Sequence, residues 1–438
     1  MASGTWTTQN KVRPGVYVNI ESAPKALGAL GERGIVSMPL LLSWGEPKTL
    51  ITVEAGEDPR HKLGYPLADE SLLLIGEALK RAGKLLVYRV NTGTKAAATL
   101  GGLTVTAKWG GLRGNDLSIV VAANVDDENR YDVKTLLKGE AVDSQTVSEI
   151  SELTPNEWVT FEGAGDLAAA AGVPLTGGSN GTATVQDYLD YLAAIELQDF
   201  NTIALPSTDT ALKAAFASFA KRLRDDEGKK IQVVMENYPS ADYEGVISVK
   251  NGVILDNGTT LSAAQATAWL AGATAGADVN ESLTYAAYDG AVDVSPRYAN
   301  SQIIEALQAG EFVFTASSGR AVVEQDINSL TSFTPEKGKA FSKNRVIRVL
   351  DAASNDLVRI FSSFYLGKVP NNDDGRNLLK GECINYLTNL LNINAIQNFD
   401  GQTDIAVSAG AEADVTVIDL AVQPVDSIEK IYTTITVR

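Results

Sequence analysis

The stretch TIALPSTDTALKAAFASFAKRLRDDEGKKIQVVM, residues 202–235, decides the fold class of this 438-residue chain. Its apolar run at 202–205 predicts a buried strand, and the apolar periodicity over 209–224 predicts an amphipathic helix. A second apolar run, at 231–235, predicts the next strand. A strand, a helix and a strand in this order form a β-α-β unit of a parallel sheet. The sequence therefore predicts an α/β domain here.

The residues that follow extend this domain. The pair Asn251-Gly252 separates the β-prone runs 246–249 and 253–255, which is the usual signal for a hairpin with a type I′ turn. The segment Ser262-Ala-Ala-Gln265 has the spacing of a capping box and precedes an Ala-rich helix. We expect a central α/β domain over 179–333.

Further domains lie on both sides of the central one. The chain is long enough for two to four domains of about 100–200 residues each. An α/β pattern covers about 25–90, strands and turns dominate 92–178, and two long helical stretches follow 334. The expected parts are an N-terminal arm (1–24), a small α/β domain (25–92), a β-sandwich insertion (93–178), a C-terminal α+β domain (334–423) and a C-terminal arm (424–438).

Composition excludes several classes of function. The net charge is −17, which repels phosphate backbones and anionic lipids, so direct nucleic-acid binding is not expected. No apolar run is long enough to span a membrane, and the N-terminus lacks the pattern of a secretory signal. Because Cys383 and His61 are the only residues of their kinds, we expect no disulfide, no metal site and no cofactor.

One motif has the pattern of a hydrolase nucleophile. Gly177-Gly-Ser179-Asn-Gly181 matches the five residues of a nucleophile elbow, so an intracellular α/β hydrolase using Ser179 is one alternative function. The residues before it are not a β-branched strand, and no His follows to act as the base. A Gly-rich linker explains the segment better. No stretch has the spacing of a phosphate-binding loop or a calcium loop.

Charge is distributed unevenly along the chain. Eleven acidic and three basic residues between 124 and 166 give a net charge of −8, which predicts a domain that faces solvent. The stretch 336–380 has nine basic and five acidic residues. It is either a solvated helix face or a docking surface for an acidic partner. The densest basic residues are Lys337, Lys339, Lys343, Arg345 and Arg348.

Both ends of the chain are short and β-prone. Such strands must pair with their own subunit or with a neighbour, because unpaired edges expose backbone donors and acceptors. Exchange between identical subunits in a head-to-tail arrangement would produce a helical filament. The physics leaves both possibilities open. The strand-forming residues are Val16, Tyr17, Val18 and Ile20 in the first arm and Ile428, Ile431, Tyr432, Ile435 and Val437 in the last.

The whole chain resembles the tail sheath proteins of contractile phage tails and phage-tail-like particles. The resemblance is carried by the order and spacing of several short motifs. They are Arg13-Pro-Gly-Val-Tyr-Val18, Gly110-Gly-Leu-Arg-Gly-Asn-Asp-Leu117, Leu175-Thr-Gly-Gly-Ser-Asn-Gly181, Asp326-Ile-Asn-Ser-Leu-Thr331 and Asp426-Ser-Ile-Glu-Lys-Ile-Tyr432.

The resemblance implies a non-enzymatic structural subunit. Hexameric rings would stack around a tail tube and contract to drive the tube through the target cell envelope, and the terminal arms would add strands to neighbouring subunits. The central domain would be subtilisin-like in fold without a catalytic triad. The C-terminal domain would face the tube, with the five basic residues of 337–348 as the candidate contact.

The implied partners are further copies of this chain, the tail tube protein, and the baseplate and tail terminator proteins. The implied location is a virion or phage-tail-like particle (a bacteriocin, for example), reached after assembly in the bacterial host cytoplasm. A small-oligomer binding protein is the remaining alternative, and it would show a defined low mass at every concentration.

Overall fold

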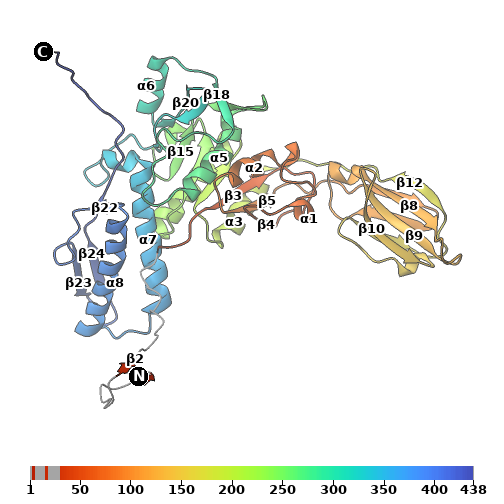
Figure 1. The fold of residues 1–438 in the computed structure, drawn as a ribbon, viewed down its shortest axis with the longest axis horizontal. Coiled ribbons are helices and arrows are strands. Elements are labelled where there is room, and N and C mark those ends of the chain that lie inside the picture. The colour runs from red at the N-terminus through yellow and green to blue at the C-terminus, as the bar shows by residue number, and fades with distance from the viewer. Residues whose placement is uncertain (1, 5–14, 18–29, 438) are drawn as a thin grey trace. The chain divides into compact units, whose positions relative to one another are not determined.

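The computed structural model describes residues 2–4, 15–17 and 30–437 (Figure 1). The chain separates into two compact units. Apart from N-terminal residues, the smaller unit comprises Asp356–Gln423, and the larger comprises Glu32–Asn355 and Pro424–Arg438. The boundary between them falls inside the long helix α7, Asn344–Phe364.

The larger unit is built on a seven-stranded sheet of order β19-β15-β14-β13-β3-β5-β4. Neighbouring strands are parallel except β4, which is antiparallel to β5. The expected β-α-β unit is confirmed, since β13 pairs in parallel with β14 and α4 (Thr210–Lys221) connects them. The strands are β3 (Ile35–Leu40), β4 (Leu50–Glu54), β5 (Lys84–Arg89), β13 (Thr202–Leu205), β14 (Gln232–Glu236), β15 (Val246–Val249) and β19 (Glu311–Phe312).

This sheet joins two segments for which the sequence predicts separate domains. Strand β3, from the expected small domain over 25–92, pairs with β13 from the expected central domain over 179–333. Val36 lies opposite Thr202, and Ser37 lies opposite Ile203. The two segments therefore share one sheet. The sequence does not reveal this because the partner strands are separated by a whole β-rich insertion.

Helices cover both faces of the sheet, because successive strand side chains point to opposite sides. Val234 and Ala204 pack in one buried cluster with α5, Ala263–Gly276. Their neighbours Val233 and Ile203 pack in a second cluster with residues of α4 and of α3, Val185–Glu196. The sheet is therefore buried between two helical layers.

Helix α5 packs very closely against α2, Leu73–Leu79. The predicted capping box is confirmed: Ser262 accepts a hydrogen bond from the Gln265 amide, and the Gln265 side chain accepts one from the Ser262 amide. Nearly all α5 residues are buried, and a Cβ added at Gly272 would lie 2.2 Å from the Ala78 carbonyl oxygen. The small side chains of α5 are thus required because its backbone lies so close to that of α2.

This packing predicts opposite signs for two Gly-to-Ala changes. Gly272→Ala is expected to lower the free energy of unfolding of the larger unit by about 1–3 kcal/mol, because overpacking against a backbone outweighs helix propensity. In α8 (Asp373–Asn392), a Cβ at Gly381 would meet nothing within 4 Å. Gly381→Ala should therefore stabilise the protein by up to about 1 kcal/mol. Denaturant unfolding measures the free-energy change of each variant. Two changes of the same sign would contradict the close packing of α5 against α2 at Gly272.

The hairpin predicted around Asn251-Gly252 is wrong. Strand β15 stays in the large sheet, whereas β16 (Gly252–Leu255) joins a three-stranded sheet of order β17-β16-β18. The Asn251 side chain is buried and bonds the backbone of Phe314 through both its amide nitrogen and its oxygen, each at 2.9 Å. This contact with a residue far along the chain holds the backbone where it passes from the seven-stranded sheet to the three-stranded sheet. The other two strands are β17 (Thr260–Leu261) and β18 (Ala291–Ser295).

The predicted β-sandwich is present, with sheets of order β10-β9-β8-β12 and β11-β7-β6. Alternate residues of β7 and β8 are buried, as expected for strands with one face in a core. The strands are β6 (Ala97–Leu100), β7 (Leu103–Ala107), β8 (Leu117–Ala123), β9 (Tyr131–Leu137), β10 (Glu140–Val147), β11 (Val159–Gly163) and β12 (Ala170–Pro174).

The smaller unit contains the second part of α7, then α8 and a two-stranded antiparallel sheet. Its strands are β23 (Ile405–Ala409) and β24 (Thr416–Leu420), which pair antiparallel. The other α-helices and strands of the described residues are β1 (Ala2–Gly4), β2 (Gly15–Tyr17), α1 (Arg60–Leu63), α6 (Asn300–Gln308), β20 (Phe314–Ser317), β21 (Arg320–Val323), β22 (Ile396–Gln397) and β25 (Gln423–Pro424).

Candidate assembly interface

The N-terminal strand forms where the sequence predicts one, in part. Strand β2 contains Val16 and Tyr17 and pairs in parallel with β1, so that Val16 lies opposite Ser3. Val18 and Ile20, the other predicted strand residues of this arm, lie outside the described residues.

Gly31 is held by a residue of α7. The Gly31 amide donates a hydrogen bond to the buried Asp356 carboxylate at 3.1 Å, and the Tyr386 hydroxyl donates to the same carboxylate at 2.9 Å. A Cβ at residue 31 would lie 2.3 Å from an Asp356 oxygen, so this contact requires glycine. The sequence analysis missed Asp356, because its partners are distant in the chain.

The C-terminal segment carries a set of exposed apolar side chains. None of the residues 425–437 forms a strand, although their sequence is strongly β-prone; they form an extended coil (Figure 1). A segment that is β-prone in composition yet exposed and unpaired is typical of a strand that forms only when a partner sheet is present. The five predicted arm residues are Ile428, Ile431, Tyr432, Ile435 and Val437, which are 86%, 81%, 92%, 84% and 92% exposed.

One residue of this segment, Glu429, is held firmly by the larger unit. Its carboxylate forms an ion pair with Lys343, and the two side chains are 12% and 13% exposed. Gln325 Nε2 donates a hydrogen bond to it at 2.5 Å, and Thr284 Oγ1 donates another at 3.0 Å. Burial raises the pKa of the Glu429 carboxyl, but hydrogen bonds from Lys343 and Gln325 outweigh this and leave the pKa below its ordinary value. We call Thr284, Gln325, Lys343 and Glu429 the Glu429 clasp.

The sequence analysis missed the role of Glu429. A usable signal was present, because Glu429 is the only acidic residue after Asp426 in an otherwise Ile-rich and Thr-rich run. A charged side chain is rarely buried unless it is paired, so the burial of this carboxylate depends on its partner Lys343.

The five predicted basic residues do not form one exposed basic surface. Lys337 Nζ lies 2.6 Å from Glu244 Oε1, and Lys343 binds Glu429. Arg345 Nε donates a hydrogen bond to the Asn280 carbonyl at 2.8 Å. Arg348 is 2% exposed and lies 3.6 Å from Asp326. Lys339 is exposed. Most of these cations are therefore balanced by contacts within the chain, and their predicted role toward a tube stays a prediction.

The smaller unit offers strand edges. Among the residues that the structure describes, β23 pairs only with β24, from Ile405↔Leu420 to Ala409↔Thr416. Helix α8 packs against β23. A two-stranded sheet of this kind leaves one edge of each strand without a strand partner. It could accept an added strand.

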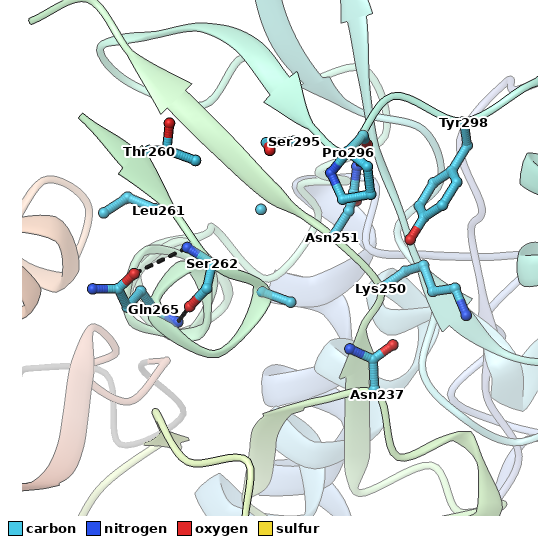
Figure 2. Close-up of a pocket in the computed structure, with 12 residues that line it drawn as sticks. Asn237, Lys250, Asn251, Thr260, Leu261, Ser262, Gln265, Ser295, Pro296 and Tyr298 are labelled. Carbon is cyan, nitrogen blue, oxygen red and sulfur yellow. Dashed lines mark hydrogen bonds between the residues drawn. The ribbon is translucent and has the colours of Figure 1, made fainter. Parts of the chain in front are cut away.

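A recess of about 510 Å³ has the lining drawn in Figure 2, and several of its polar side chains form structural bonds. Ser262 and Gln265 are joined by the two hydrogen bonds of the capping box, drawn as dashed lines in Figure 2. Lys250 forms an ion pair with Glu311 at 2.7 Å, and the Asn251 amide bonds the Phe314 backbone. These four side chains therefore stabilise the fold around the recess.

Ser179, the nucleophile of the hydrolase alternative, and His61 are bonded to different partners. Ser179 is exposed; its hydroxyl lies 3.2 Å from Thr94 Oγ1, and its backbone forms an isolated bridge with Thr94. His61 is exposed and its Nδ1 lies 2.7 Å from Glu157 Oε2. Over residues 30–437 and the two short N-terminal strands, no group of three or more His, Cys, Asp or Glu residues could hold a metal ion. None of the helices in the same residues is both long and apolar enough to cross a membrane.

Comparison with known protein families matches nearly the whole chain. Four domain models match in order along it. They are the "Tail sheath protein Gp18 domain III N-terminal region" at 33–90, the "Phage tail sheath protein beta-sandwich domain" at 91–180, the "Phage tail sheath protein central domain" at 181–329 and the "Phage tail sheath C-terminal domain" at 336–438.

The chain belongs to the contractile phage tail sheath protein family. The crystal structure of a sheath tail protein from Desulfitobacterium hafniense is similar to it at 66% identity and a TM-score of 0.88, covering 96% of this chain and 99% of that one. The Phage-like element PBSX protein XkdK of Bacillus subtilis is 43% identical over 99% of both chains.

More distant sheath proteins share the fold. The helical sheath of the anti-feeding prophage in its contracted state is 14% identical, with a TM-score of 0.57 over 97% of this chain and 99% of that one. The resemblance noted in the sequence is thus confirmed, as is the multidomain α/β architecture with a β-sandwich domain. Sheath proteins of this family are structural parts of phage or phage-like particles.

Proposed function

We propose that this chain is the contractile subunit of a tail sheath that assembles as hexameric rings stacked around a tail tube. The observation that carries the proposal is the exposed, β-prone segment 430–437, which lacks a strand partner among the described residues. A segment of this kind gains backbone hydrogen bonds when it adds to the sheet of a neighbouring subunit. The open edges of β23 and β24 are suitable acceptors.

Strand exchange would link each subunit to others while allowing the lattice to change. In a head-to-tail arrangement, such contacts do not close on themselves and generate a helical polymer. Contraction would then exchange one set of contacts between subunits for a set of lower free energy and drive the tube through the target envelope. The subunit would supply this energy through assembly geometry, as a non-enzymatic protein.

The partners follow from the same proposal. The tail tube protein would lie inside the rings, and baseplate and tail terminator proteins would lie at the two ends. Assembly would take place in the cytoplasm of a bacterial host, as part of a phage or a phage-tail-like particle. Lys339, which remains exposed, is the predicted basic residue best suited to contact a tube.

Negative-stain electron microscopy and sedimentation of the purified chain test this proposal. We expect long, hollow, striated tubes and a polydisperse sedimentation profile that grows with concentration. If only small particles form, addition of the tube protein should produce tubes. A uniform low mass under both conditions would contradict the proposal and would support the alternative of a small-oligomer binding protein.

A further inference from the structure

The Glu429 clasp holds one residue between two exposed apolar neighbours. Ile428 before it and Ile431 after it are 86% and 81% exposed, whereas the Glu429 side chain is 12% exposed. Three hydrogen-bonding side chains converge on its carboxylate from separate parts of the larger unit. Charge-assisted hydrogen bonds are stronger than neutral ones, so the contact fixes the position of this one residue.

The three residues that hold Glu429 are themselves tied to one another. The Asp326 amide, next to Gln325, donates a hydrogen bond to Thr284 Oγ1 at 3.0 Å, and the Asn344 amide, next to Lys343, donates to the Asp326 carbonyl at 3.1 Å. The Asp326 carboxylate accepts from the Leu283 amide at 3.0 Å and lies 3.6 Å from Arg348. The clasp is therefore built on a buried network whose members hold each other in place.

The position of Glu429 matters because of the pattern that follows it. Ile431, Thr433, Ile435 and Val437 alternate with Lys430, Tyr432, Thr434 and Thr436. Side chains of a strand point to opposite faces in turn, so a slip of one residue would exchange the two sets. The register of the strand must therefore be fixed by a specific contact, so that each set of side chains lies on the correct face of the sheet.

We propose that the Glu429 clasp is the positioning site of the C-terminal donor strand. It holds residues up to 429 on their own subunit, starts the donated strand at Lys430 and thereby sets the strand's register in the neighbouring sheet. This inference rests on the proposed exchange of arms. Eight residues, 430–437, span roughly 27 Å as a strand, which is a typical strand length. Lys343 is accordingly a positioning residue of the arm.

Charge variants of the clasp test this inference. Glu429→Gln keeps the shape of the side chain but removes the ion pair, and the double variant Lys343→Glu with Glu429→Lys restores it in reverse. We expect Glu429→Gln to reduce the fraction of protein in tubes at least fivefold, and the double variant to recover most of it. Glu128→Gln, the same change at an exposed position of the sandwich, should leave assembly unchanged.

Hydrogen exchange separates positioning from folding. In the unassembled subunit, Glu429→Gln should accelerate exchange of the Asp326 amide, which donates to Thr284 Oγ1 of the clasp, severalfold, while the protection of the large sheet stays at its wild-type level. Full assembly by Glu429→Gln, or more assembly than in the wild type, would overturn the inference, since the clasp would then be dispensable or would hold the arm back. A failure of the double variant to recover tubes would overturn it as well.

A deletion of residues 430–438 distinguishes failure of this inference from failure of the proposed function. If the deletion forms normal tubes, the exchange of C-terminal arms is wrong. If the deletion abolishes tubes but Glu429→Gln assembles normally, arm exchange stands and only the positioning role of the clasp is wrong.

Discussion

Deletion of residues 430–438 is expected to abolish tube formation and to leave both compact units folded. The deleted segment contributes almost nothing to the isolated subunit, because its apolar side chains are more than 80% exposed. In an assembled sheath, the same residues would bury their apolar faces and pair their backbone groups with a neighbouring sheet. The change therefore affects association far more than folding.

Sedimentation and electron microscopy measure the association, and circular dichroism with thermal unfolding measures the fold. A milder variant separates strand pairing from simple loss of chain. Proline has no backbone donor and is poorly tolerated inside a sheet, so Ile431→Pro should reproduce the deletion. Ile431→Val keeps the β-branched shape and serves as the matched control. Tubes of normal length from the proline variant would show that residue 431 does not pair as a strand.

Asp351→Ala is expected to lower the free energy of unfolding of the larger unit by about 3–5 kcal/mol. Asp351, in α7, accepts two hydrogen bonds from the Arg224 guanidinium at 2.6 and 2.8 Å, and the two side chains are 12% and 4% exposed. Burial alone would lower the pKa of Arg224, but the Asp351 carboxylate raises it above its ordinary value. Without Asp351, a buried cation would lose its counter-charge.

Two further variants make this prediction specific. Arg224→Met combined with Asp351→Leu removes both charges and should recover most of the lost stability, because the cost comes from an uncompensated charge. Asp373→Ala removes a carboxylate that also pairs with an arginine, Arg376, but is 93% exposed. It should change the free energy of unfolding by at most about 1 kcal/mol. Denaturant unfolding measures all three, and a loss in the double variant as large as that in Asp351→Ala would contradict the argument.

Local patterns predicted the local structure of this chain well. The β-α-β unit over 202–235 and the capping box at Ser262 are present where the sequence places them, because each is formed by contacts within one continuous segment, such as Thr202↔Gln232 in the first and those between Ser262 and Gln265 in the second. The Asn251-Gly252 hairpin failed for the opposite reason. A side-chain contact to Phe314, far along the chain, overrode the turn propensity of the pair.

The candidate interface was predictable in part. The composition of the terminal segments predicts strands, and the exposure of residues 430–437 agrees with that interpretation. The basic stretch did not reveal its contacts, since the partners of Lys343 and Arg348 are Glu429 and Asp326, each in a different segment. Sequence spacing gives the sign of a charge but not whether the folded chain already neutralises it.

The β-sandwich insertion begins and ends at a single point. Thr94 and Ser179 exchange backbone hydrogen bonds of 2.8 and 3.2 Å, so the segment leaves the host sheet and returns to it side by side. A segment closed in this way can be replaced without stretching the strands on either side, as in successful domain insertions. The pair Thr94 and Ser179 therefore marks the boundary at which a foreign module could be grafted, if it preserves the contacts of the host with the insertion, such as the Trp44–Trp158 ring pair and the hydrogen bond from the buried Arg89 to the Gly110 carbonyl.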